Sequence, residues 1–181
     1  MGRLIGRSAA SLGICVALLG AAAVAEDLKV GDKAPEFELK GSDGKTYKLS
    51  DFQGKKPVVI AWFPKAFTGG CTKECKAFRS SSDSLKGTGV AYFTASTDEP
   101  DLNKKFAESL DLDYPILSDP SKETAKAYGV VHEGRMVPER WTFYIDKEGV
   151  IRFIDKGVQQ RTETAGEDVV SKLKELKLSG E

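Results

Sequence analysis

The sequence has no excess of charge of either sign. Its 181 residues include 27 Lys and Arg against 27 Asp and Glu. Proteins that bind nucleic acid or an anionic membrane surface without a specific pocket usually depend on a strong basic excess. The charge balance therefore argues against both classes of partner. Internal repeats, low-complexity tracts and linkers are also missing, which predicts one domain rather than a string of modules.

The sequence also lacks an apolar run long enough to cross a membrane. The run from Ser11 to Ala25 is about 15 residues, and a spanning helix needs roughly 20. It follows Arg3 and Arg7 and ends in Ala-Val-Ala, a small-x-small cleavage pattern. Residues 1–25 are therefore predicted to be a signal peptide, and residues 26–181 to be the mature domain. We expect an exported, periplasmic protein with a net charge of about −2, because the signal removes two Arg and no acid.

Cysteine is scarce. Of the three in the chain, Cys15 lies in the predicted signal, so the exported protein keeps only Cys71 and Cys75. Ile14 precedes Cys15 where a lipid-anchored protein would have a small residue. Exported cysteine pairs suggest a disulfide, but a spacing of four makes an ordinary structural bridge unfavourable. A metal pair, a structural disulfide and a reactive thiol with a partner all remain open at this point.

Alternating apolar stretches and helical patterns follow one another along the mature chain. Residues 36–39 and 46–49 alternate around "GSDG", and residues 140–146 and 150–155 flank "KEG"; the two turns predict two hairpins. Buried strands are predicted from the apolar runs, and helices from the 3.6-residue spacing. The predicted strands cover 57–63, 89–96, 114–120, 140–146 and 150–155, and the helices 72–85, 98–112, 121–130 and 167–178. This order predicts a three-layer α/β sandwich with an N-terminal β-hairpin.

In that layout Cys71 follows a central strand and lies in the first turn of the next helix. Open α/β sheets place reactive groups at this edge. The free backbone N–H groups and positive end of the helix favour a thiolate. Gly69 and Gly70 can adopt backbone angles that other residues resist, so that amides approach a small substrate. The Thr68 hydroxyl can both donate and accept a hydrogen bond.

These residues resemble a known family. Pro64, Thr68 and Cys71 match the P-x-x-x-T-x-x-C signature of peroxiredoxins, and Arg140 in "PERWTFYIDKEG" matches the arginine before their late strand. The stretches "GDKAPEFEL", "TASTDEP" and "FAESLDLDYPILSDPSKETAKAYGV" are similar to the bacterioferritin-comigratory, or PrxQ-type, branch of the AhpC/TSA superfamily. The resemblance covers nearly all of residues 27–178. It implies a thioredoxin-like version of the predicted sandwich, with a monomer favoured and a dimer possible.

The resemblance implies a thiol-dependent peroxidase that reduces hydrogen peroxide and organic hydroperoxides. Cys71 would be the peroxidatic thiolate and would become a sulfenic acid. Arg140 would stabilise the thiolate and polarise the peroxide, which Thr68 would orient and Gly70 would help to bind. Pro64 would shield the thiol from water.

Glu74, on the first helical turn, would hold an arginine in place. The family uses no cofactor or metal, and its members are recycled by a thioredoxin-like reductant. The expected partners are therefore a hydroperoxide and that reductant, with no nucleic acid and, once the signal is cleaved, no membrane.

The chain departs from the branch at two positions. Gly69 replaces the usual proline, and Cys75 lies four residues after Cys71 where the branch has its resolving cysteine five residues on. Arg79 keeps its usual distance from Cys71, so no deletion explains the shift. In an intact helix, Cα atoms four residues apart are about 6 Å apart but their Cβ directions suit a disulfide poorly. Cys75 is thus a candidate resolving cysteine only if the first turn unwinds; otherwise an outside thiol must resolve Cys71.

Two other functions are weighed against this one. An exported thiol–disulfide oxidoreductase would need W-C-x-x-C, but three residues separate these cysteines and no Trp precedes Cys71. A Sco-like copper-binding protein would combine Cys71, Cys75 and His132, yet Arg140 stands near that family's histidine position, where a cation is unfavourable. Taken singly, Thr68 could be a plain helix cap and Arg140 a surface ion pair.

Overall fold

The apolar runs of the sequence form the centre of a β-sheet. The protein is described by a computed structural model that covers residue 2, residues 28–131, residue 134 and residues 136–180. All five side chains of Val58–Trp62 are buried, as expected for a strand covered on both faces. In chain order the elements are β1 (Glu38–Gly41), β2 (Thr46–Lys48), η1 (Leu49–Asp51), β3 (Val58–Trp62), α1 (Gly69–Ser80), α2 (Ser82–Gly87), β4 (Ala91–Ser96), α3 (Pro100–Ser109), β5 (Ile116–Ser118), α4 (Glu123–Ala127), β6 (Thr142–Ile145), β7 (Ile151–Asp155), η2 (Val158–Gln160) and α5 (Ala165–Glu175).

The strands form one seven-stranded sheet in the order β2-β1-β5-β4-β3-β6-β7. The central strands β3, β4 and β5 run parallel, and the flanking strands join antiparallel. The crossover through α1 and α2 and the crossover through α3 step along the sheet in the same direction. Because parallel crossovers are right-handed, these helices lie on the same face of the sheet.

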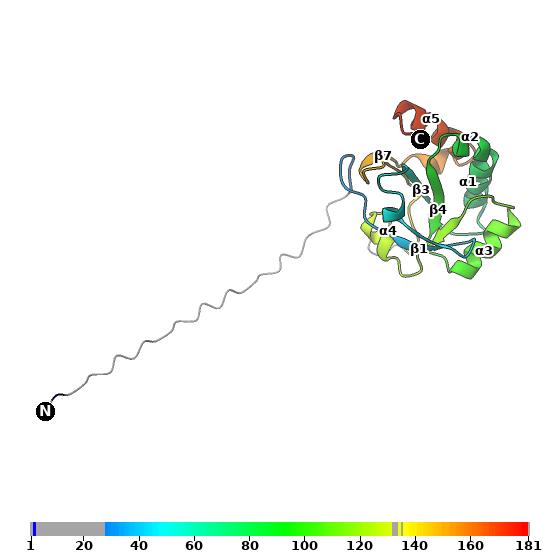
Figure 1. The fold of residues 1–181 in the computed structure, drawn as a ribbon. Helices are drawn as coiled ribbons and strands as arrows, with labels where there is room; N and C mark the ends of the chain where they lie inside the picture. The colour runs from blue at the N-terminus through cyan, green and yellow to red at the C-terminus, as the bar shows by residue number, and fades with distance from the viewer. Residues whose placement is uncertain (1, 3–27, 132–133, 135, 181) are drawn as a thin grey trace.

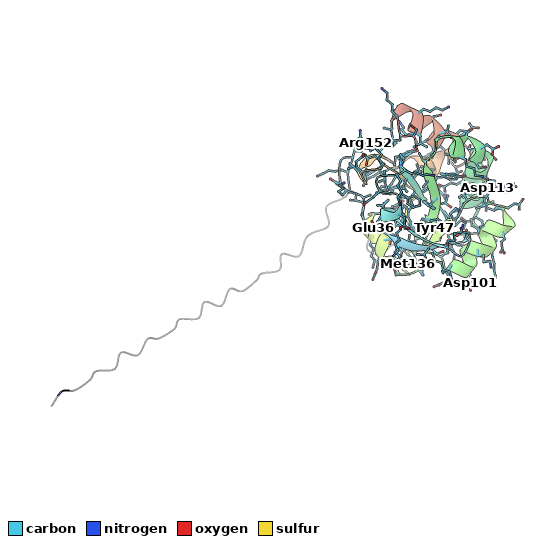
Figure 2. All side chains as sticks on the ribbon, in the orientation of Figure 1. Glu36, Tyr47, Asp101, Asp113, Met136 and Arg152 are labelled. Carbon is cyan, nitrogen blue, oxygen red and sulfur yellow. The ribbon has the colours of Figure 1, made fainter. Side chains whose placement is uncertain are left out.

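Helices and loops cover both faces of this sheet. On one face α1, α2 and α5 pack over a cluster that includes Phe78 and Tyr92, and α3 closes a neighbouring cluster through Phe106. On the other face α4 and the adjoining loops cover a cluster that includes Trp62 and Tyr128. Figure 1 shows α4 across the central strands from α1 and α2, and the side-chain sticks of Figure 2 fill the space between these layers. The predicted three-layer sandwich is confirmed.

Both predicted hairpins are present. β1 pairs with β2 around the "GSDG" turn, and β1 then pairs with β5, which adds the N-terminal hairpin to the edge of the parallel strands. β6 and β7 form the late hairpin on the opposite side of the sheet.

The observed helices differ in two ways from the single helix predicted over residues 72–85. The helix begins earlier, at Gly69, and the chain divides at Ser81 into α1 and α2. Ser81 lies within a run of serines, whose hydroxyls compete for backbone hydrogen bonds and weaken a helix interior. Cys71 is consequently the third residue of α1, still within its first turn.

Two predictions fall on residues that are not described. The predicted signal, apart from Gly2, and His132, the histidine of the copper-binding alternative, both lie outside the described residues. Among the helices that are described, none combines the length and apolar character needed to cross a membrane.

Candidate active site

The antiparallel pairing of β6 with β3 builds the site. Ala61, near the end of β3, pairs with Thr142 at the start of β6, and the Trp62 amide donates to the Trp141 carbonyl at 2.8 Å. Arg140 comes just before these paired residues of β6. It is thereby placed beside the segment that connects β3 to α1. The predicted meeting of Arg140 with Cys71, which lie 69 residues apart in the chain, is confirmed.

The Arg140 guanidinium is held at all three of its nitrogens. Nη2 lies 3.3 Å from Cys71 Sγ, Nη1 forms an ion pair with Glu74 Oε2, and Nε donates to Gln159 Oε1 at 3.0 Å. Cys71 and Glu74 are 0% exposed and Arg140 only 5%. Arg140 is therefore part of a buried charge cluster, and the alternative of a surface ion pair is wrong.

Burial and neighbouring charges shift the pKa values of this cluster in opposite directions. Burial would lower the pKa of Arg140, but the adjacent Glu74 carboxylate and Cys71 sulfur outweigh it and raise that pKa. Burial raises the pKa of Glu74 to about 7, although Arg140 opposes the rise. The second carboxyl oxygen, Oε1, is buried and has no hydrogen-bond partner among the described residues. Arg140 thus stays charged, while Glu74 changes charge near neutral pH.

Glu74→Gln is expected to remove a pH dependence of stability. The pKa of Glu74 rises from 4.5 to about 7 on folding, so the folded state holds a proton that the unfolded state has released. The stability that this proton contributes is fully present below the pKa of the unfolded state. It is lost as the pH rises to about 7, the pKa in the folded state. Wild type should lose on the order of 2–3 kcal/mol more than Glu74→Gln between about pH 5 and pH 8 in denaturant titrations. Glu163→Gln, which breaks the exposed pair with Lys73, is the matched control. Parallel curves for wild type and Glu74→Gln would contradict this reading.

The segment between β3 and α1 carries the other predicted site residues. Pro64 is half-buried and Thr68 is exposed at the N-cap position of α1. The Thr68 hydroxyl makes no capping bond to the helix and instead donates to the Lys65 carbonyl at 2.9 Å. The Thr68 oxygen therefore keeps its capacity to accept a hydrogen bond from a ligand.

The two glycines act differently from the prediction. Gly69 and Gly70 have no left-handed backbone angles because they are the first residues of α1; the left-handed residue of this segment is Phe67, with φ of 60°. A Cβ on Gly70 would lie 3.2 Å from Arg140 Nη2. The absence of a side chain at Gly70 therefore gives the guanidinium room beside Cys71.

A buried polar network that was not predicted holds the segment between β3 and α1 in place. The Ala66 amide donates to Asp98 Oδ2 at 2.8 Å, and Ser96 Oγ donates to the same oxygen at 3.0 Å. Asn103 of α3 donates in turn to Ser96 Oγ at 3.0 Å and to Ser118 Oγ at 2.9 Å. Asp98 could have been noticed as an acid just after a buried strand, at the edge where the site lies. The sequence has no comparable signal for Gln159, a polar residue in the short turn η2.

Cys75 lies on the inner side of α1. It is 0% exposed, in the same cluster as Cys71 and Phe106, and both cysteines are free thiols. Burial raises the pKa of the Cys75 thiol well above that of an exposed cysteine, and the Glu74 carboxyl adds to the rise. Cβ atoms one helical turn apart are about 5–6 Å apart, farther than a disulfide allows. A Cys71–Cys75 bond requires α1 to unwind locally.

The copper-binding alternative finds little support in this geometry. The Arg140 guanidinium touches the Cys71 sulfur, and its positive charge would repel a bound cation. Within the described part of the chain, no group of three or more His, Cys, Asp or Glu side chains is arranged to hold a metal ion.

Comparisons with known proteins agree with the site. The AhpC/TSA family pattern matches residues 30–154. The chain is 40% identical over 125 residues to "Peroxiredoxin Q, chloroplastic" of Populus jackii, covering 68% of this chain and 58% of that relative. It is 37% identical over 133 residues to "Peroxiredoxin Bcp" of Escherichia coli K12, covering 70% of this chain and 85% of that relative.

A solved structure gives the same result for the fold. The crystal structure of peroxidoxin BcpB from Mycobacterium tuberculosis superposes with a TM-score of 0.72 at 32% identity, covering 83% of this chain and 97% of that one. The family pattern spans well over half of the chain, and neither the oxidoreductase nor the copper alternative is favoured. The chain belongs to the AhpC/TSA family, in its bacterioferritin-comigratory, or peroxiredoxin Q, branch.

Proposed function

We propose that the protein reduces hydroperoxides and that Cys71 is its peroxidatic residue. The observation that carries the proposal is the 3.3 Å contact between Arg140 Nη2 and Cys71 Sγ in the first turn of α1. A guanidinium and a helix N-terminus both stabilise a negative sulfur, which is the nucleophilic form of cysteine. The same positive charge faces the oxygen that gains electrons when the O–O bond breaks.

The first step consumes one hydroperoxide. The Cys71 thiolate attacks the terminal oxygen of ROOH, an S–O bond forms, and the O–O bond breaks. The sulfur is oxidised to a sulfenic acid, and the leaving oxygen takes the bonding electrons and a proton to become ROH. Thr68 Oγ accepts the hydrogen of the peroxide, Gly70 leaves room for it beside Arg140, and Pro64 limits water around the sulfur.

Cys71 is more fully shielded than the sequence indicates. Its exposed fraction is 0%, so a peroxide reaches the sulfur only when the segment between β3 and α1 moves. The hydrogen bond from Ala66 to Asp98 ties this segment to the end of β4. We infer that small outward motions of residues 64–68 admit the substrate while Arg140 stays in place.

Cys75 is the proposed resolving cysteine. Its thiol attacks the sulfenic sulfur of Cys71, a disulfide forms and water leaves; a thioredoxin-like dithiol then reduces that disulfide through a mixed disulfide. A bridge across four residues closes too small a ring to stabilise the fold by much. It suits a bond that forms and breaks in each cycle.

Cys75→Ser is expected to separate the two steps. Cys71 should still react once with peroxide, and then persist as a trappable sulfenic acid or oxidise further. Steady-state turnover with a dithiol reductant should fall by at least about tenfold, because resolution then depends on an outside thiol. If wild type forms no Cys71–Cys75 disulfide by mass and the variant turns over normally, the protein is a one-cysteine enzyme.

The activity itself is tested by a coupled assay. Reduced protein, a thioredoxin and its reductase should consume reductant when either hydrogen peroxide or an organic hydroperoxide is added, and the two rates measure substrate preference. No consumption with either peroxide, for protein whose two thiols are shown to be free, would refute the proposal.

We further propose export to the periplasm and a monomeric state. The basic start, short apolar run and Ala-Val-Ala pattern of residues 1–25 support export. Protein isolated from its native host should begin at Glu26, and retention of Met1 would contradict cleavage. Sedimentation of the mature chain should give a monomer mass; a stable dimer would contradict that part.

A further inference from the structure

Tyr114 donates a hydrogen bond to the helix that carries both cysteines. Its hydroxyl lies 3.0 Å from the backbone carbonyl oxygen of Cys75. The Tyr114 side chain is only 6% exposed, so this carbonyl takes the place of water as its partner. A buried hydroxyl that loses its acceptor is destabilising, because no water replaces the lost partner.

The Tyr114 ring is fixed by its neighbours. It packs against Phe78 of α1 and Tyr92 of β4, with ring centroids 6.0 Å and 5.4 Å away. The preceding residue, Asp113, pairs with Lys86 of α2 and lies on the α1 and α2 side of the molecule in Figure 2. Tyr114 therefore cannot follow the Cys75 carbonyl if that carbonyl moves.

The later half of α1 is held in place by α5. A Cβ on Gly166 of α5 would lie 2.3 Å from the Ala77 carbonyl oxygen, so the two helices are in backbone contact there. Unwinding that carries Cys75 toward Cys71 is thereby limited to residues 69–76. The carbonyl that Tyr114 binds lies inside this short segment.

We propose that Tyr114 is a positioning residue. Its hydrogen bond to the Cys75 carbonyl, here called the latch, holds the first turns of α1 and sets how often they unwind to release Cys75. The proposal rests on the proposed role of Cys75 as the resolving cysteine. Opening residues 69–76 takes the Cys75 carbonyl away from the Tyr114 hydroxyl, which is then left with the neighbouring Thr94 hydroxyl of β4 in place of that acceptor. The latch slows disulfide formation, and it keeps Cys71 beside Arg140 while the enzyme waits for peroxide.

Tyr114→Phe and Tyr92→Phe form a matched pair of variants. Both remove one buried hydroxyl from the same cluster, but the Tyr92 hydroxyl has no hydrogen-bond partner in the part of the chain that is described. In the reduced protein, amide hydrogen exchange of residues 69–76, relative to that of α5, should be about fivefold faster in Tyr114→Phe. Tyr92→Phe should exchange like wild type. Equal exchange in all three proteins, or equal acceleration in both variants, would overturn the latch.

Disulfide formation supplies the second measurement. After one equivalent of hydrogen peroxide, Tyr114→Phe should form the Cys71–Cys75 disulfide about fivefold faster than wild type, with the rate of sulfenic acid formation unchanged. If exchange rises in Tyr114→Phe but no protein forms this disulfide, the latch stands and Cys75 is not the resolving cysteine. If the disulfide forms at the same rate in wild type and Tyr114→Phe, the latch does not control resolution and the proposal fails.

Discussion

Cys71→Ser is expected to abolish peroxide turnover, with a loss of at least about 10³-fold in kcat/KM. A serine hydroxyl stays protonated at neutral pH and is a far poorer nucleophile than a thiolate. The contact with Arg140 cannot compensate, because a neutral oxygen gains little from a nearby positive charge. Turnover is measured in the coupled assay with a thioredoxin, under saturating reductant.

Cys75→Ser is the control for Cys71→Ser. Both variants remove one fully buried sulfur from the same helix, so both should melt at similar temperatures. Only Cys71→Ser should lose the first, stoichiometric reaction with peroxide. Peroxide consumption that survives in Cys71→Ser would mean that another group carries the chemistry.

Arg140→Met is expected to slow the oxidation of Cys71 by about 10²–10³-fold. The substitution removes the guanidinium 3.3 Å from the sulfur while keeping an apolar side chain of similar length. It also leaves Glu74 buried beside no positive charge, so the pKa of that carboxyl rises further, and a loss of roughly 3–5 kcal/mol of stability is expected only at alkaline pH, where the carboxyl ionises. Stopped-flow oxidation with stoichiometric peroxide measures the rate, and denaturant titration measures the stability.

The double variant Arg140→Met with Glu74→Gln separates catalysis from stability. It removes the uncompensated carboxylate, so stability should recover while oxidation stays slow. Recovery of the oxidation rate along with stability would mean that Arg140 acts only by holding the fold. The rate of Cys71 oxidation in Arg140→Lys should fall between those of wild type and Arg140→Met, because a lysine keeps the charge but cannot contact Cys71, Glu74 and Gln159 together.

The fold follows closely from local patterns in the sequence. The run at residues 57–63 is apolar and β-branched, and it becomes a fully buried strand because helices and loops cover both of its faces. The "GSDG" and "KEG" turns mark the two hairpins. The division of α1 from α2 at Ser81 was not predicted, since a helical spacing of apolar residues continues across it.

The candidate site could be predicted only in part. Cys71 and Arg140 meet because β6 pairs with β3, and the peroxiredoxin resemblance carries that long-range information. The contacts from Asp98, Gln159 and Tyr114 depend on side chains that are brought together by tertiary packing, which no local pattern records. The left-handed angle at Phe67 was missed for another reason: two glycines stand nearby, and glycine is the residue that usually takes such angles.

Mapping the oxidised sulfur tests the central claim most directly. Reduced protein is treated with one equivalent of hydrogen peroxide, with and without a sulfenic-acid trap, and its peptides are analysed by mass. With the trap, the adduct should lie on Cys71; without it, Cys71 and Cys75 should be joined in one disulfide-linked product. An adduct on Cys75 with Cys71 unmodified, or two free thiols after peroxide, would contradict Cys71 as the peroxidatic residue.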